Sequence, residues 1–159
     1  MNARDWLDGV RMVHSDMEVL RGRIRRTEEL LGLHGIDYSR GGTPSGTGDA
    51  GLDGKVAELV ELRRRLGDME RAWIDCEDEA AYVLGAIGDP VAKVAVSMRF
   101  LDGASWRRIA DELGYSSKSS AAMLVDRTVE AMDVWLVPVL QQYRVDRADA
   151  DGADEKERL

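Results

Sequence analysis

The residues best suited to bind a ligand lie in one stretch, between Ser105 and Met132. Lysine and arginine side chains bind phosphate oxygens, and serine hydroxyls pair with the edges of bases. The chemistry that this stretch indicates is therefore contact with a nucleic acid. The candidate contact residues are Arg107, Arg108, Ser117, Lys118, Ser119, Ser120, Met123 and Arg127.

Two short helices that cross at a tight turn are needed to position these residues. The first should run from its cap at Ser105 to Leu113, and Gly114 should end it in the left-handed geometry that glycine favours. The second should start at residue 116 or 117 and reach at least Leu136, with Pro138 kinking or restarting it. This order of helix, turn and helix predicts a helix-turn-helix.

The helix-turn-helix geometry assigns a role to each candidate residue. The first turn of the second helix meets base edges, so residues 118–120 are the candidate readers. Ser117 and the free backbone amides of the same turn suit a phosphate group. Arg107 and Arg108 should lie on the outer face of the first helix and bind backbone phosphates.

Other kinds of site are not indicated by the sequence. His14, His34 and Cys76 are too few and too scattered to hold a metal ion. The glycine-rich segment before Val56 resembles a phosphate-binding loop only superficially, because Asp49 stands at its first glycine position and no strand precedes it. We expect no enzyme activity, no metal and no cofactor.

Two longer segments upstream carry apolar residues at steps of three and four, which is the spacing of helices that pair side by side. The first helix should span Arg4 to Leu31, and the second should run from residue 52 or 53 to Ile87. The first stripe comprises Trp6, Val10, Val13, Met17, Leu20, Ile24 and Leu31. The second comprises Val56, Leu59, Leu62, Leu66, Met69, Trp73, Cys76, Ala80, Val83 and Ile87. An antiparallel hairpin is predicted, and apolar residues beside the stripes, such as Leu30 and Val60, favour a homodimer through it.

These elements predict an all-α fold, with a long antiparallel helical hairpin followed by a compact helix-turn-helix domain. The hairpin should occupy residues 1–88, with a Gly/Ser-rich loop at 32–54 in which only Ile36 and Tyr38 could anchor. The helix-turn-helix domain should occupy 89–143, entered through a helix from Pro90 to about Leu101 that Asp89 caps. Residues 144–159 should form a disordered acidic tail, because their charges alternate without apolar periodicity.

Composition limits the class of protein. No apolar run is long enough to span a membrane, and one cysteine among 159 residues fits a reducing cytoplasm. The net charge is −8, which is unusual for a nucleic-acid binder, but residues 89–143 contribute only −1 of it. Tight non-specific binding to DNA is therefore not expected from charge alone.

The block SWRRIADELGYS, residues 105–116, resembles region 4 of bacterial sigma factors. The chain as a whole resembles phage transcriptional regulators of the RinA/ArpU type over roughly residues 20–135, in the order GIDYS at 35–39, a Gly/Ser/Thr-rich loop, KVAELVELRRRL and MRFLDGASWRRIADELGYS. The resemblance implies binding of double-stranded DNA, and contact with RNA polymerase, through the helix-turn-helix. The chain departs from the family after the serine cap, since SSKSSAAMLVDRTV lacks Arg, Asn and Gln in its first two turns.

Two alternatives to DNA reading remain open on the sequence. The chain could be a helical interaction or scaffold protein that keeps the fold without binding DNA, or a DNA-packaging subunit that forms rings. The arginine-rich runs at 21–26 and 63–65 could contact phosphates or RNA polymerase, but acids one turn away favour a solvated helix face.

Overall fold

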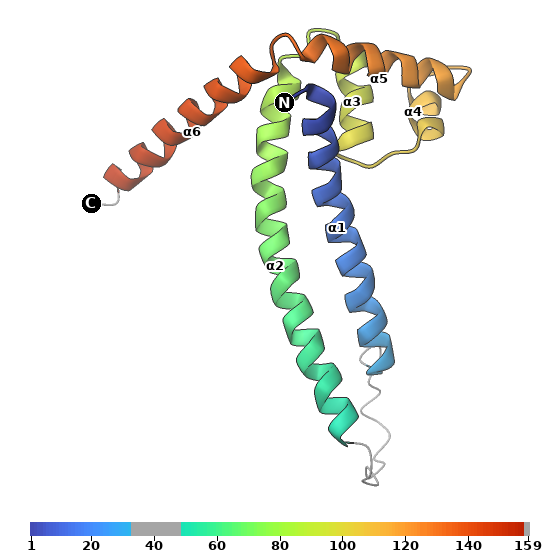
Figure 1. Ribbon diagram of the computed structural model, residues 1–159, viewed down its shortest axis with the longest axis vertical. Helices are drawn as coiled ribbons and strands as arrows, with labels where there is room; N and C mark the ends of the chain where they lie inside the picture. Colours follow the sequence, from blue (N-terminus) through green and yellow to red (C-terminus); the bar gives the residue numbers. More distant parts are fainter. Residues whose placement is uncertain (33–48, 158–159) are drawn as a thin grey trace. The chain divides into compact units, whose positions relative to one another are not determined.

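The computed structural model of the chain describes residues 1–32 and 49–157, and within these ranges every regular element is an α-helix (Figure 1). The all-α fold predicted from the sequence is thereby confirmed. The helices are α1 (Ala3–Leu30), α2 (Asp49–Gly85), α3 (Pro90–Phe100), α4 (Trp106–Glu112), α5 (Lys118–Met132) and α6 (Leu136–Glu157). No helix in the described part of the chain is both long and apolar enough to cross a membrane.

The predicted helix starts after residue 88 are confirmed by their caps. Asp89 accepts a hydrogen bond from the Val91 amide at 3.0 Å, and Pro90 takes the first helical position of α3. Ser105 caps α4, and Ser117 caps α5. Each cap satisfies a backbone amide that the first turn of a helix leaves without an intrahelical partner.

The end of α5 differs from the prediction. The helix stops at Met132, before Leu136, and a turn at 133–135 separates it from α6. The amides of Asp133 and Trp135 donate hydrogen bonds to the carbonyls three residues earlier. This is the tighter pattern of a 3₁₀ turn, and it ends the α-helix. Pro138 then falls in the first turn of α6, where its missing amide costs little.

The stretch from residue 144 onward also differs from the prediction, because α6 continues through it as far as Glu157. Local contacts explain the helix in its first part: Gln142 donates to Asp146 at 2.7 Å, and Arg147 donates to the Tyr143 hydroxyl at 3.0 Å. Arg147 also pairs with Asp75 of α2 at 2.5 Å. Alternating charges at a spacing of four support a helix as readily as they indicate disorder.

The loop predicted at 32–54 is described only in part. α2 already begins at Asp49, and Gly32 follows α1 with a φ of 65°. The anchors expected at Ile36 and Tyr38, and the GIDYS segment, lie outside the described residues.

The chain divides into two compact units, which we call unit 1 (residues 1–14 and 73–159) and unit 2 (residues 15–72). The predicted boundary at residue 88 therefore differs from the observed division, which crosses both long helices. The reason is that Ala3 and Leu7 of α1, and Val83 and Leu84 of α2, belong to the same buried cluster as the C-terminal helices.

In unit 1, that cluster is built mainly on α3, α4 and α5. Phe100 of α3, Ile109 of α4, and Val125 and Met132 of α5 are almost completely buried in it. Leu7 is also completely buried, although it lies off the predicted stripe of α1. It shares its buried cluster with the end of α2 and with the helices after residue 88, and a two-helix pattern does not anticipate the latter.

In unit 2, α1 and α2 run antiparallel along one apolar seam. Arg21 pairs with Glu70 at 3.0 Å and Glu28 with Arg63 at 2.6 Å, so the partner moves backward along α2 as α1 advances. The buried apolar cluster of this unit consists of Ile24, Leu59 and Leu62, flanked by Leu20, Leu31 and Leu66. Val56, predicted on the stripe, is exposed.

Candidate nucleic-acid interface

The candidate interface is formed by α4, the turn after it and α5, all in unit 1. The Ser105 hydroxyl accepts the amide of Arg108 at 3.2 Å, which fixes the first turn of α4. The helix ends at Gly114, whose φ of 70° lies in the left-handed region. The Tyr115 amide donates back to the Ala110 carbonyl at 2.8 Å and closes the turn. α5 can therefore start in a new direction within a few residues of α4.

The serines at the start of α5 are partly committed to the helix itself. The Ser117 hydroxyl oxygen accepts the Ser120 amide at 3.2 Å and lies 3.0 Å from the Ser120 hydroxyl oxygen. Ser117 and Ser120, predicted to contact phosphate and a base, thus stabilise the first turn of α5. Ser119 is exposed between them.

One face of α5 is buried and the opposite face is exposed. Ala121, Val125 and Val129 recur every four residues on the buried face. Ser119, Met123 and Arg127 recur at the same spacing on the exposed face, and the Met123 side chain is 64% exposed. An exposed row along a helix that is anchored by its other face has the geometry of a binding surface.

Three of the predicted contact residues lie around one hollow. Arg107 of α4, Ser117 and Lys118 line a cavity of about 340 Å³, together with Tyr115 and Asp111. Arg107 is 78% exposed, and its only acidic neighbour within pairing distance in the described structure is Asp111 at 3.9 Å. A guanidinium held this loosely is available to a phosphate group.

Arg127 belongs to a different hollow. It lines a cavity of about 350 Å³ with Asp89, Leu124, Thr128 and Trp135, on the side of α5 that faces the start of α3. The structure therefore does not bring all the predicted contacts to one place. Arg108 is exposed on α4 but does not line either hollow.

Charge on the exposed faces of α4 and α5 is balanced. The basic residues are Arg107, Arg108, Lys118 and Arg127, and the acidic ones are Asp111, Glu112, Asp126 and Glu130. The acids lie outside the first turn of α5, which carries Lys118 and no carboxylate. The balance is thus uneven along the helix, with the excess of positive charge at its N-terminal end.

Two residues of α1 that sequence reasoning missed support α5. Arg4 forms an ion pair with Asp126 and so offsets one of the four acids. The Ala3 amide donates to the Asp133 carboxylate at 2.6 Å, just beyond the end of α5. More than 120 positions separate the partners along the chain, and no local sequence pattern signals either contact.

Arg99 holds the start of α4 in a similar way. Its guanidinium lies 4.3 Å from the centre of the Trp106 ring and donates to the Ala104 carbonyl at 3.0 Å. Burial lowers the pKa of Arg99. Trp106 packs against the core of unit 1 and also provides the ring face for the Arg99 guanidinium.

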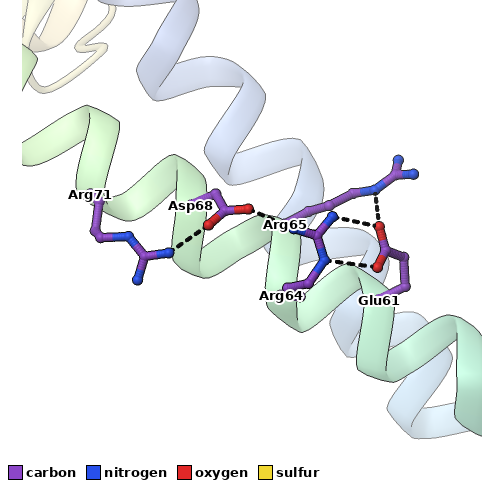
Figure 2. A network of polar contacts seen from close by, with 5 residues as sticks. All are labelled: Glu61, Arg64, Arg65, Asp68 and Arg71. Carbon is purple, nitrogen blue, oxygen red and sulfur yellow. Dashed lines mark hydrogen bonds and ion pairs between the residues drawn. The ribbon is translucent and has the colours of Figure 1, made fainter.

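The arginine run of α2 at residues 63–65 is paired with acids. Arg64 pairs with both Glu61 and Asp68 at 2.9 Å, and Arg65 pairs with Glu61 at 2.9 Å (Figure 2). Arg71 pairs with Asp68 at 2.5 Å. Hydrogen bonds from Arg64 and Arg65 lower the pKa of Glu61 to about 2. Because acids on the helices pair with these arginines, we interpret residues 63–65 as a solvent-exposed, charge-balanced face of α2.

Among the residues described, no group of three or more His, Cys, Asp or Glu side chains is arranged to hold a metal ion. Comparisons with protein-family models, with curated proteins and with solved structures give no match for this chain.

Proposed function

We propose that α4, the turn at Gly114 and α5 form a helix-turn-helix that binds double-stranded DNA, and that the chain is a transcriptional regulator of the phage type. The observation that carries the proposal is the first turn of α5. It is exposed, it holds Lys118 without any acid, and it shares a hollow with Arg107 of the preceding helix.

The chemistry of this turn suits a phosphate and a base edge at the same time. The N-terminal end of a helix carries a partial positive charge and free amides, which attract anions. Lys118 and Ser119 project from that end, and Met123 offers an apolar contact to a thymine methyl group one turn later. Arg107 and Arg108 would hold the DNA backbone.

The resemblance of residues 105–116 to sigma factor region 4 supports the same assignment, with RNA polymerase as a second partner. The first two turns of α5 contain no Arg, Asn or Gln, so specificity would be modest. With about three phosphate contacts, the logarithm of the affinity should fall with that of salt at a slope of about −3. No catalytic role is proposed.

Selection of bound sites from a random pool of duplex DNA, at low and moderate salt, tests this function. Enrichment of a common motif is the expected result. The proposal fails if no motif is enriched and the protein shows no salt-dependent retention of DNA.

The second candidate function is that of a helical interaction or scaffold protein. It is favoured by the balanced charge on the exposed faces of α4 and α5, where Asp111, Glu112, Asp126 and Glu130 match the basic residues in number. A chain of this kind would give no enrichment in the selection and would retain its fold and its protein contacts.

A further inference from the structure

A groove lies between α1 and α2 within unit 2. Its volume is about 500 Å³, and it is lined by Asp16, Val19, Leu20 and Arg23 of α1 and by Arg65, Asp68 and Met69 of α2. The contacts of the proposed DNA-binding unit lie in other residues, so the proposed function does not account for this surface.

The middle of the groove is apolar. Val19 is 66% exposed, and Leu20 and Met69 are half-buried beside it. Leu30 is 71% exposed and lies eleven residues, or close to three helical turns, after Val19, so it continues the same side of α1. Among the described residues of unit 2, the buried apolar side chains are those of Met17, Ile24, Leu59 and Leu62. A partner that covers the groove would therefore add substantially to the apolar surface removed from water.

The charges of the groove are sorted along its length. Asp16 and Arg23 are seven residues apart on α1, which separates them by two turns or about 10 Å. The three cross-helix ion pairs, Arg21–Glu70, Arg23–Glu58 and Glu28–Arg63, together set an antiparallel register. This register places Arg65 near the level of Arg23, and Asp68 near the level of Val19 and Leu20. One end of the groove therefore carries Arg23 and Arg65 and is basic, and the other end carries Asp16 and is acidic. Val19 and Asp68 lie between the two ends.

We propose that a second copy of this chain occupies the groove, related to the first by a two-fold axis that passes near Val19. A two-fold axis reverses the direction of the groove, so the acidic end of one copy meets the basic end of the other. Asp16 of each copy then faces Arg23 of its partner, and the two Val19 side chains pack together at the centre. A nucleic acid would meet Asp16 and Asp68 in the same groove, which disfavours it as the occupant.

The arginines at the basic end of the groove keep N–H donors that can bind a partner. Arg23 uses one terminal nitrogen for Glu58 at 2.5 Å, and Arg65 uses its Nε for Glu61 at 2.9 Å. A guanidinium has five N–H donors, so each arginine keeps several for a partner. Within the described part of the chain, no basic side chain is within pairing distance of Asp16.

Light scattering of the full chain over a wide range of concentration tests the dimer. We expect a monomer–dimer equilibrium, and Val19→Glu should raise its dissociation constant at least about tenfold because two carboxylates would meet in the apolar centre. Val60→Glu is the matched control, because Val60, which the sequence pattern also offered for a dimer contact, does not line this groove. Val60 is 65% exposed but lies two residues, or about 200°, from the buried Leu62, so it points away from the seam and the groove. Circular dichroism checks that both variants keep their helix content.

A monomer at all concentrations would overturn the proposal, as would ring-sized assemblies or equal effects of Val19→Glu and Val60→Glu. Charge reversal then tests the pairing. Asp16→Arg alone and Arg23→Asp alone should each weaken self-association, because like charges would face each other across the axis. A mixture of the two variants should form heterodimers, since each copy then supplies the charge that the other lacks. Absence of heterodimers from the mixture would refute the Asp16–Arg23 contact.

Discussion

Unit 1 and unit 2 share the helices α1 and α2 but are held together in different ways. Unit 1 contains a cluster of 19 buried apolar residues drawn from all six helices, whereas the cluster of unit 2 contains three. Unit 2 adds ion pairs between its helices, such as Arg21–Glu70 and Arg23–Glu58. Those pairs are solvent-exposed, and exposed pairs contribute little to stability.

The comparison shows that one helix can be stabilised by tertiary packing in one half, and mainly by its own helix propensity and exposed ion pairs in the other. In unit 1, α2 is fixed by side chains that interdigitate with several neighbours. In unit 2, the same helix depends on its own propensity, on a single seam and on salt-sensitive charges. We therefore expect unit 2 to open at a lower free energy than unit 1.

The largest effect should come from one substitution made in both halves of α2. Leu84 is 1% exposed in the core of unit 1, and Leu62 is 3% exposed in the seam of unit 2. Leu84→Ala should cost about 3–5 kcal/mol, because the surrounding helices cannot close the cavity. Leu62→Ala should cost about 2 kcal/mol or less, because a one-sided seam can collapse onto the smaller side chain.

Urea denaturation combined with amide hydrogen exchange measures both losses. In the Leu62→Ala protein, faster exchange should be confined to residues of unit 2. Equal losses for the two variants, or exchange that rises throughout the chain after Leu62→Ala, would show that the units are not distinct in stability.

A smaller loss of stability is expected when the pH is lowered. The pKa of Glu61 is lowered from its ordinary 4.5 to about 2 by hydrogen bonds from Arg64 and Arg65. A carboxylate with a depressed pKa in the folded state stabilises the fold above its unfolded pKa, and this contribution is lost as pH falls from about 4.5 toward 2. Acidification through this window should therefore weaken unit 2, and Glu61→Gln should remove that part of the pH dependence.

An NMR titration of the Glu61 carboxyl carbon gives the midpoint directly, and Arg64→Gln should move it upward. Glu77→Gln serves as a control, because no ion pair involves Glu77 among the described residues. A Glu61 midpoint near 4.5 in the native protein would contradict the pairing drawn in Figure 2.

Structural features that depend only on residues close together in the chain could be predicted from the sequence. The caps at Asp89, Ser105 and Ser117, and the turn at Gly114, are local signals, and they placed α3, α4 and the start of α5 correctly. The three- and four-residue spacing likewise placed both long helices. The side chains of the exposed first turn of α5 followed from the same local pattern.

Features that depend on distant parts of the chain could not be predicted. The burial of Leu7 and the ion pair of Arg4 with Asp126 join α1 to helices more than 70 positions away. The residue that follows α5, Asp133, accepts a hydrogen bond from Ala3 of α1, and the helix beyond residue 144 pairs with Asp75 of α2 in addition to its local contacts. A local pattern contains none of these partners.

The proposal that α5 binds DNA through its first turn is tested most directly by one titration. The affinity of the full chain for a short DNA duplex is measured by fluorescence anisotropy at two salt concentrations, for the wild type, Lys118→Ala and Lys93→Ala. Lys93 is an exposed lysine of α3, so its loss removes the same charge elsewhere in unit 1. The account predicts salt-dependent binding that Lys118→Ala weakens about tenfold or more and that Lys93→Ala leaves nearly unchanged. Equal weakening by both variants, or no binding by the wild type at low salt, would contradict it.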